Sequence, residues 1–462
     1  MRFPSPAISR RNFIRLGVSG LVPLAGFRPT FAAGKRAPAK NVLVILEQGG
    51  LSQMDTWDPK PDAIAEHRSP FKPISTKVPG MKFTELLTHT ARVADKLAVV
   101  RSMWHPKAGA SGHGEGTQYM LSGAHPGSAI PMPDLGSIAS HTLGTDAHFL
   151  PPYIMVPGND EQNAVTSTGF LPVGTKAFKT GGGDLSAPGW KVGALEPRPE
   201  TNADRLAARQ QLLAGLNSHS STGAGRTFGG MDRFYDQAFD TLTSPKVAKA
   251  FDYQSEPQKV REAYGKGHRG ACYLVGRKLI EAGVRFVTVD VRWPLAPEYP
   301  GGFNMNWDHH DLMYANGSCG TIRDKAGGEG RYGISTWPMM GSTDRAFAAL
   351  IEDLDQRGLL AETLVCFVTE FGRTPKLNKF QGRDHWTNAY SIAFAGAGVK
   401  GGQVIGSTDK DGGTVTNDPW TPEAYAATVF EKLGIDRAKP LYTASDRPVF
   451  IGHDADPISQ LM

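Results

Sequence analysis

Acids, imidazoles and guanidinium groups gather late in the sequence, directly after an apolar run. Glu370 and Arg373 stand just past the end of a predicted strand, and a loop returns Asp384 and His385 shortly afterwards. Carboxylate and imidazole groups suit divalent cations, and a guanidinium matches two oxygens of a phosphate or sulfate. These residue types predict a metal or anion site, with Arg373 or Arg101 stabilising a developing negative charge. An Arg–Glu ion pair that only holds the loop is the structural alternative.

A second set of candidate ligands lies further back, where Trp307 is followed by Asp308, His309, His310 and Asp311. In an extended segment, alternate residues face the same side, so an Asp-x-His spacing points both donors one way. Asp308 and His310 are therefore predicted metal ligands, and His309 competes with His310 for that role. A surface loop with clustered polar residues is the alternative interpretation.

Two glycine-rich segments supply the remaining candidates. The first follows the opening apolar run, and its glycines allow a tight turn that presents Ser52 and Asp55. The second carries Ser111 and His113 among several glycines, and we interpret it as a tightly turning polar loop that faces a ligand. The structural alternatives are a plain strand-to-helix turn for the first segment and a solvent-exposed loop for the second.

Short apolar runs alternate with helical patterns, which predicts an α/β fold with a mostly parallel sheet wrapped by helices. The ligand sites of such sheets lie at the carboxyl ends of the strands, and each group of candidates follows such an end or a glycine turn. We therefore expect the candidates to meet at one edge of the sheet. The predicted strands are 41–46, 96–100, 153–156, 284–289, 363–368 and 390–394, and the predicted helices include 269–281 and 342–357.

The N-terminal segment has the features of an export signal. Arg10 and Arg11 precede an apolar run that is too short to span a bilayer and ends near Ala33. This predicts a twin-arginine signal peptide at 1–33, the twin-arginine translocase as export partner and a periplasmic or secreted mature protein. The mature chain is expected to have no integral membrane segment.

The mature protein is predicted to be a single domain at 34–462. Its net charge limits the kinds of partner that it can bind. The formal net charge of +5 falls to zero without residues 1–33, which contain five arginines and no acid. The mature chain therefore has no basic excess with which to bind nucleic acid. A stretch at about 157–230, rich in Gly, Ser, Thr and Pro, is predicted to be an insertion that covers the site.

The chain resembles the bacterial domain-of-unknown-function family 1501, whose members look like distant relatives of alkaline phosphatases and sulfatases. The resemblance implies a three-layer alkaline-phosphatase-like sandwich with a mostly parallel central sheet and a Gly/Pro-rich insertion. The matching pieces are spread over most of the mature chain. They are GGLSQMDTWDPKPDA at 49–63, RSMWH at 101–105, GRKLIEAGVRFVTV at 276–289, WDHH at 307–310, EDLDQRGLLAETLV at 352–365, TEFGRTP at 369–375 and GRDHW at 382–386.

The wider superfamily implies a set of metal ligands. Asp308, His310 and His385 resemble the ligands of one divalent cation, such as zinc, and Glu370 and Asp384 are further candidate ligands. Gln48 stands at or beside the place of a second-metal acid, and Glu370-Phe371 replaces an Asp-His pair. One metal is therefore expected rather than two. The superfamily spacing for the nucleophile falls on His113, which we interpret as a metal ligand, a general base or a nucleophile, with Ser52 and Ser111 as alternative nucleophiles.

Two functions follow as hypotheses. The first is an extracytoplasmic, metal-dependent hydrolase of phosphate or sulfate esters, acting on a small molecule or a polysaccharide. The second is a non-catalytic surface protein that keeps the hydrolase fold and binds a metal or a glycan.

Overall fold

The computed structural model describes residues 39–145, 149–158, 167–181, 183–195, 244–291, 305–315, 318–319, 331–452 and 455–462, and single positions between 205 and 241. All of them belong to one compact unit, Ala37–Met462. The predicted signal peptide lies outside the described residues, as does a large part of the predicted insertion at 157–230. No helix within the described residues has the length and apolar character needed to cross a membrane.

A central sheet carries the site, and its middle strands are parallel. β1 (Asn41–Leu46) lies between β10 (Thr363–Val368) and β7 (Phe286–Asp290) and is parallel to both. Almost every side chain of these strands is buried, which is why their sequences are continuous aliphatic runs rather than alternating patterns. The order of the eight described strands is β14 (Gln403–Ile405), β4 (Leu97–Met103), β13 (Tyr390–Ala395), β10, β1, β7, β5 (Tyr153–Pro157) and β6 (Phe178–Lys179).

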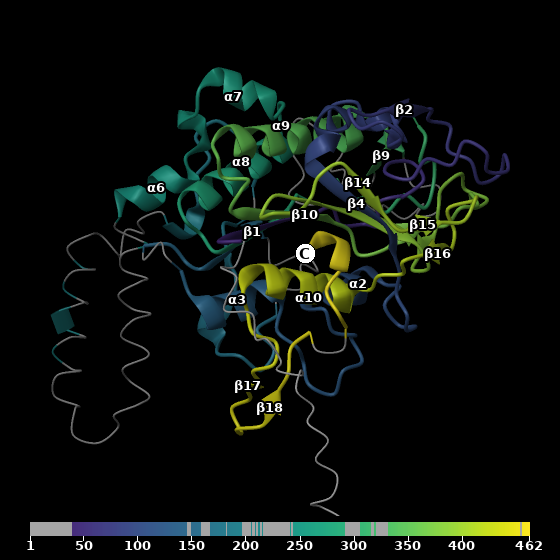
Figure 1. The fold of residues 1–462 in the computed structure, drawn as a ribbon. Helices are drawn as coiled ribbons and strands as arrows, with labels where there is room; N and C mark the ends of the chain where they lie inside the picture. Colours follow the sequence, from purple (N-terminus) through teal and green to yellow (C-terminus); the bar gives the residue numbers. More distant parts are fainter. Residues whose placement is uncertain are drawn as a thin grey trace, which may run out of the picture. The chain divides into compact units, whose positions relative to one another are not determined.

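Helices cover both faces of the sheet. Leu43 and Ile45 of β1 belong to a core that includes residues of α8 (His268–Glu281) and α9 (Ser342–Gln356). The alternate residues of β1 face the opposite core, formed with α2 (His113–Ser122), α3 (Leu135–Leu143) and α10 (Pro422–Leu433). Figure 1 shows the sheet between these two helix layers.

The remaining elements are short. They are β2 (Pro73–Ser75), β3 (Lys82–Thr84), η1 (Glu85–Leu87), η2 (Thr90–Lys96), η3 (Val173–Thr175), η4 (Gly193–Leu195), α6 (Pro245–Phe251), η5 (Tyr253–Ser255), α7 (Gln258–Ala263), β8 (Ser318–Cys319), β9 (Arg331–Tyr332), η6 (Trp337–Gly341), β11 (Gly372–Arg373), β12 (His385–Trp386), β15 (Ser407–Thr408), β16 (Val415–Asn417), β17 (Leu441–Tyr442), β18 (Pro448–Val449) and η7 (Ser459–Leu461).

The predicted three-layer α/β architecture with a mostly parallel sheet is confirmed, and so are the six predicted strands. β13 is antiparallel to both of its neighbours, so the sheet is mixed rather than purely parallel. The prediction of a loop around His113 was wrong, because His113 is the first residue of α2. The glycines of this segment allow close packing instead, since a Cβ at Gly116 would lie 3.0 Å from the Phe371 ring.

Candidate metal centre

The candidate residues come from four separate segments that meet where β1 and β10 end. Asp308 and His310 lie in a loop that is fixed to the end of β1 by a hydrogen bond from Trp307 N to Gln48 O, 3.0 Å long. His113 starts α2, and His385 lies in β12. β12 pairs with β11 in an antiparallel hairpin that follows β10 and sets His385 opposite Arg373. The expectation that distant residues meet at one edge of the sheet is therefore met.

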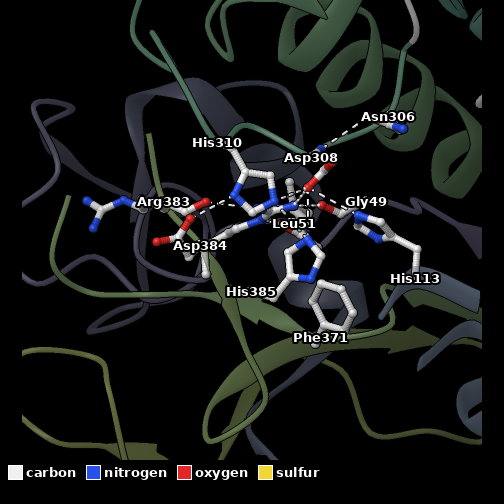
Figure 2. A network of polar contacts seen from close by, with 12 residues as sticks. Gly49, Leu51, His113, Asn306, Asp308, His310, Phe371, Arg383, Asp384 and His385 are labelled. Carbon is white, nitrogen blue, oxygen red and sulfur yellow. Dashed lines mark hydrogen bonds and ion pairs between the residues drawn. The ribbon is translucent and has the colours of Figure 1, made fainter. Parts of the chain in front are cut away.

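Three imidazoles converge on one carboxylate oxygen. Asp308 Oδ1 lies 3.1 Å from Nε2 of His113, 2.9 Å from Nε2 of His310 and 2.9 Å from Nε2 of His385. The Nε2 atoms of His310 and His385 are themselves 3.0 Å apart. Figure 2 shows the three rings around Asp308, with Phe371 packed against His385 at a ring separation of 4.5 Å. The four polar side chains are between 16% and 23% exposed, so solvent can reach the centre.

The opposite nitrogen of each ring is held by an acceptor. Nδ1 of His113 lies 2.7 Å from Glu370 Oε1, and Nδ1 of His310 lies 2.8 Å from Asp384 Oδ1. Nδ1 of His385 lies 2.6 Å from the backbone oxygen of Ser111. Carboxylate and carbonyl oxygens accept hydrogen bonds, so each Nδ1 carries a proton and each Nε2 faces Asp308.

This arrangement fits a divalent cation. Lone pairs of neighbouring Nε2 atoms repel each other unless a proton or a cation lies between them. Ligands of a tetrahedral zinc ion at 2.0–2.1 Å lie about 3.3 Å from one another, close to the separations found here. Metal-binding histidines usually donate their second ring N–H to a carboxylate or a carbonyl, as all three do in this protein. His113, Asp308 and His385 form a group with the spacing of a metal site.

The charges of the centre are coupled. Burial would raise the pKa of Asp308, but the Arg373 guanidinium and the three imidazoles hold this pKa far below its usual range. Burial would also lower the pKa of His113. Hydrogen bonds to Asp308 and Glu370, and the charges of these carboxylates, outweigh burial and raise the pKa of His113 to about 9. In the metal-free centre at neutral pH, His113 therefore carries a second proton, on the Nε2 atom that faces Asp308.

Glu370 and Asp384, predicted as metal ligands, lie behind the histidines. Each faces the Nδ1 side of its ring, and the Nε2 atom of that ring points to the centre. Glu370 also accepts a hydrogen bond of 2.7 Å from the backbone N–H of Gly49. In this structure the two carboxylates fix the tautomer and orientation of their histidines, so the ligand role predicted for them needs correction.

Arg373 and His309 are directed towards protein acceptors. Arg373 is fully buried and donates to Asp308 Oδ1 at 2.7 Å, to Gly50 O at 2.9 Å, to Arg383 O at 2.8 Å and to Gly49 O. The guanidinium thus acts on the centre through Asp308. His309 Nε2 lies 2.8 Å from Tyr332 O, so His310 rather than His309 faces the centre.

The two predicted serine nucleophiles lie in different surroundings. The buried hydroxyl of Ser52 donates to Asp55, whose carboxylate is also paired with Arg383 at 3.1 Å. Ser111 is exposed, and it reaches the centre through its backbone oxygen. Neither hydroxyl has a hydrogen bond to the three imidazoles among the contacts of the described residues.

Two glycines beside Asp308 have roles that could not be predicted from the sequence alone. Gly49 has φ +112°, and a Cβ on it would lie 2.2 Å from the backbone nitrogen of Trp307. On the other side, a Cβ at Gly382 would lie 2.0 Å from the backbone carbon of His310. Both glycines stand in the sequence motifs, but only the folded chain reveals which backbone each one faces.

The fold and the site define a three-layer α/β protein with a histidine-rich centre suited to a cation. The chain belongs to the family described as protein of unknown function DUF1501, whose model matches residues 39–462. No match was found among curated protein sequences.

Several solved structures are similar to the chain. A phosphonate monoester hydrolase of Agrobacterium radiobacter is 12% identical, with a TM-score of 0.37 over 91% of this chain and 77% of that one. A sulfatase from Pseudoalteromonas sp. is 12% identical, with a TM-score of 0.36 over 88% and 69%. The lipoteichoic acid synthase from Listeria monocytogenes is 9% identical, with a TM-score of 0.32 over 87% and 73%. These similarities are too remote to transfer any residue or substrate.

Proposed function

We propose that the protein is a hydrolase that depends on one divalent cation and acts on phosphate or sulfate esters outside the cytoplasm after twin-arginine export. One observation carries this proposal. Three imidazole Nε2 atoms converge on the Asp308 carboxylate, and each ring is fixed from behind by an acceptor. Imidazoles held from behind in this way are typical of metal ligands, which supports a cation site over a solvated polar loop.

The chain's own residues prepare the centre for chemistry. A bound divalent cation would supply Lewis acidity and lower the pKa of a water molecule at the site. Asp308, His113 and His385 would hold it, with His310 completing the set. Glu370 and Asp384 keep the Nε2 atoms of His113 and His310 directed inwards, and Arg373 keeps Asp308 ionised.

Neighbouring histidines provide a matched test. His310→Ala removes an inward-facing imidazole, and His309→Ala removes one that is bonded to Tyr332 O. We expect the purified protein to contain one equivalent of metal and to hydrolyse at least one of p-nitrophenyl phosphate, bis-p-nitrophenyl phosphate and p-nitrophenyl sulfate. His310→Ala should lose both properties, and His309→Ala should keep both. Metal-free wild-type protein after incubation with zinc would overturn the proposal.

A second candidate function is a non-catalytic metal- or glycan-binding surface protein. It is favoured by Arg373, whose donors are directed at four protein acceptors. It is also favoured by the hydroxyls of Ser52 and Ser111, which have no hydrogen bond to the three imidazoles among the contacts of the described residues. Metal-loaded protein that hydrolyses none of the three substrates but binds a polysaccharide would identify this function instead.

A further inference from the structure

A buried ion pair connects the end of β1 to the loop that carries Asp308. Glu47 follows β1 directly and is 1% exposed. Its carboxylate accepts hydrogen bonds of 2.8 and 2.6 Å from Arg269 Nη1 and one of 2.6 Å from Tyr273 OH, both residues of α8. The Glu47 carboxylate also accepts a hydrogen bond of 2.7 Å from Nε1 of the Trp307 indole. Glu47 therefore holds the residue that immediately precedes Asp308.

The Glu47–Arg269 pair contacts the loop that carries Asp308, called the ligand loop, at two more points. Arg269 Nη2 donates to the backbone oxygen of Met305 at 3.3 Å, and its guanidinium lies 5.6 Å from the centre of the Trp307 ring. Arg269 Nε donates to Ser342 Oγ at 3.0 Å, which fixes the guanidinium from the other side. The loop is thus attached through a side chain and through its backbone before it reaches Asp308.

A contribution to stability alone does not explain this arrangement. Desolvating two charges offsets much of their attraction, so a buried ion pair is weak evidence for a stabilising role. The hydrogen bonds of such a pair fix the positions of the groups that share it. Here the shared group is Trp307, so the pair also fixes the position of the adjacent Asp308.

We propose that Glu47 is a positioning residue of the metal centre, which acts through Trp307 to hold Asp308 within reach of the three imidazoles. The proposal rests on the proposed function, because it assigns a role in binding the cation. Glu47 itself contacts Trp307, Arg269 and Tyr273 rather than the inward-facing nitrogens.

Two substitutions separate positioning from plain stabilisation. Trp307→Phe and Tyr273→Phe each remove one hydrogen bond to the same carboxylate, at 2.7 and 2.6 Å, and each keeps an aromatic ring. Only Trp307→Phe breaks a hydrogen bond between Glu47 and the ligand loop. Zinc affinity would be measured by competition with a chromophoric chelator, and Tm would be measured on the metal-free proteins.

We expect Trp307→Phe to weaken zinc binding about tenfold or more, as loss of outer hydrogen bonds at metal sites usually does. Tyr273→Phe should lower Tm by a similar amount. Its zinc affinity should stay within about twofold of wild type, because this substitution breaks no hydrogen bond to the loop. Glu47→Gln, a second variant that keeps the side-chain shape, should weaken zinc binding in the same direction as Trp307→Phe. Equal zinc affinities of the Trp307 and Tyr273 variants would overturn the positioning role while leaving the proposed function intact. A wild-type protein that binds no zinc would instead overturn both.

Discussion

The two halves of the candidate metal centre each pair an imidazole with a carboxylate, in different surroundings. In the inner half, His113 is held by Glu370, which is fully buried, and in the outer half His310 is held by Asp384, whose side chain is 53% exposed. The two carboxylate–imidazole distances are nearly equal, at 2.7 and 2.8 Å. Water screens the outer pair and not the inner one, so equal geometry does not imply equal strength. We infer that the inner pair contributes more than the outer pair to the affinity of the proposed cation site for zinc.

The largest effect is expected where the two halves meet. Asp308→Asn removes the charge to which all three Nε2 atoms point and leaves the buried Arg373 without its carboxylate partner. We expect more than about a hundredfold loss of zinc affinity and, because a buried charge loses its partner, a stability loss of about 3 kcal/mol. Metal analysis after dialysis would measure the loss of zinc, and urea unfolding would measure the loss of stability. Retained stoichiometric zinc would show that neither half needs the Asp308 charge to bind the cation.

The comparison itself is tested by neutralising the two rear carboxylates one at a time. Glu370→Gln and Asp384→Asn each keep an oxygen that can accept the imidazole N–H, so each isolates the effect of charge. We expect Glu370→Gln to weaken zinc binding by about 10- to 100-fold. Asp384→Asn, at an exposed site, should weaken it by at most about fivefold. Isothermal titration would give both values, and equal losses would contradict the assignment of inner and outer halves.

A pH dependence should come from the inner half. The pKa of His113 is raised to about 9 in the metal-free centre, so below that pH a cation must displace its proton. Zinc affinity should therefore rise with pH up to about 9, and binding at pH 7 should release a proton. Titrations in buffers of different ionisation enthalpy would count the protons released. Binding at pH 7 with no proton release would place the neutral form of His113 in the metal-free protein.

The smallest effect is expected outside both halves. Ser52→Ala removes a buried hydroxyl that donates to Asp55, and Asp55 keeps its ion pair with Arg383. We expect about 1 kcal/mol of lost stability and hydrolysis within about twofold of wild type. Kinetics on whichever p-nitrophenyl substrate the wild type hydrolyses would decide this. A loss of activity without loss of metal would make Ser52 the nucleophile.

The sequence was informative where one property decides the structure. The aliphatic runs of β1 and β10 admit little besides a buried strand, and both were predicted with the observed bounds. It was less informative where the direction of a side chain decides. Glu370 and Asp384 have ligand chemistry, and only the fold shows that they face Nδ1 atoms rather than the centre. His309 and His310 are adjacent and identical in type, and Tyr332 O, a distant acceptor, separates their roles.

The glycines on either side of the Asp308 loop limit how this centre can change. With Gly49 against Trp307 and Gly382 against His310, one added methyl group on either side would overlap the loop's main chain. A side chain at Gly49 or Gly382 could therefore be introduced only by displacing this loop. Moving the Asp308 loop onto another scaffold would require two neighbouring backbone positions without side chains, one on each side.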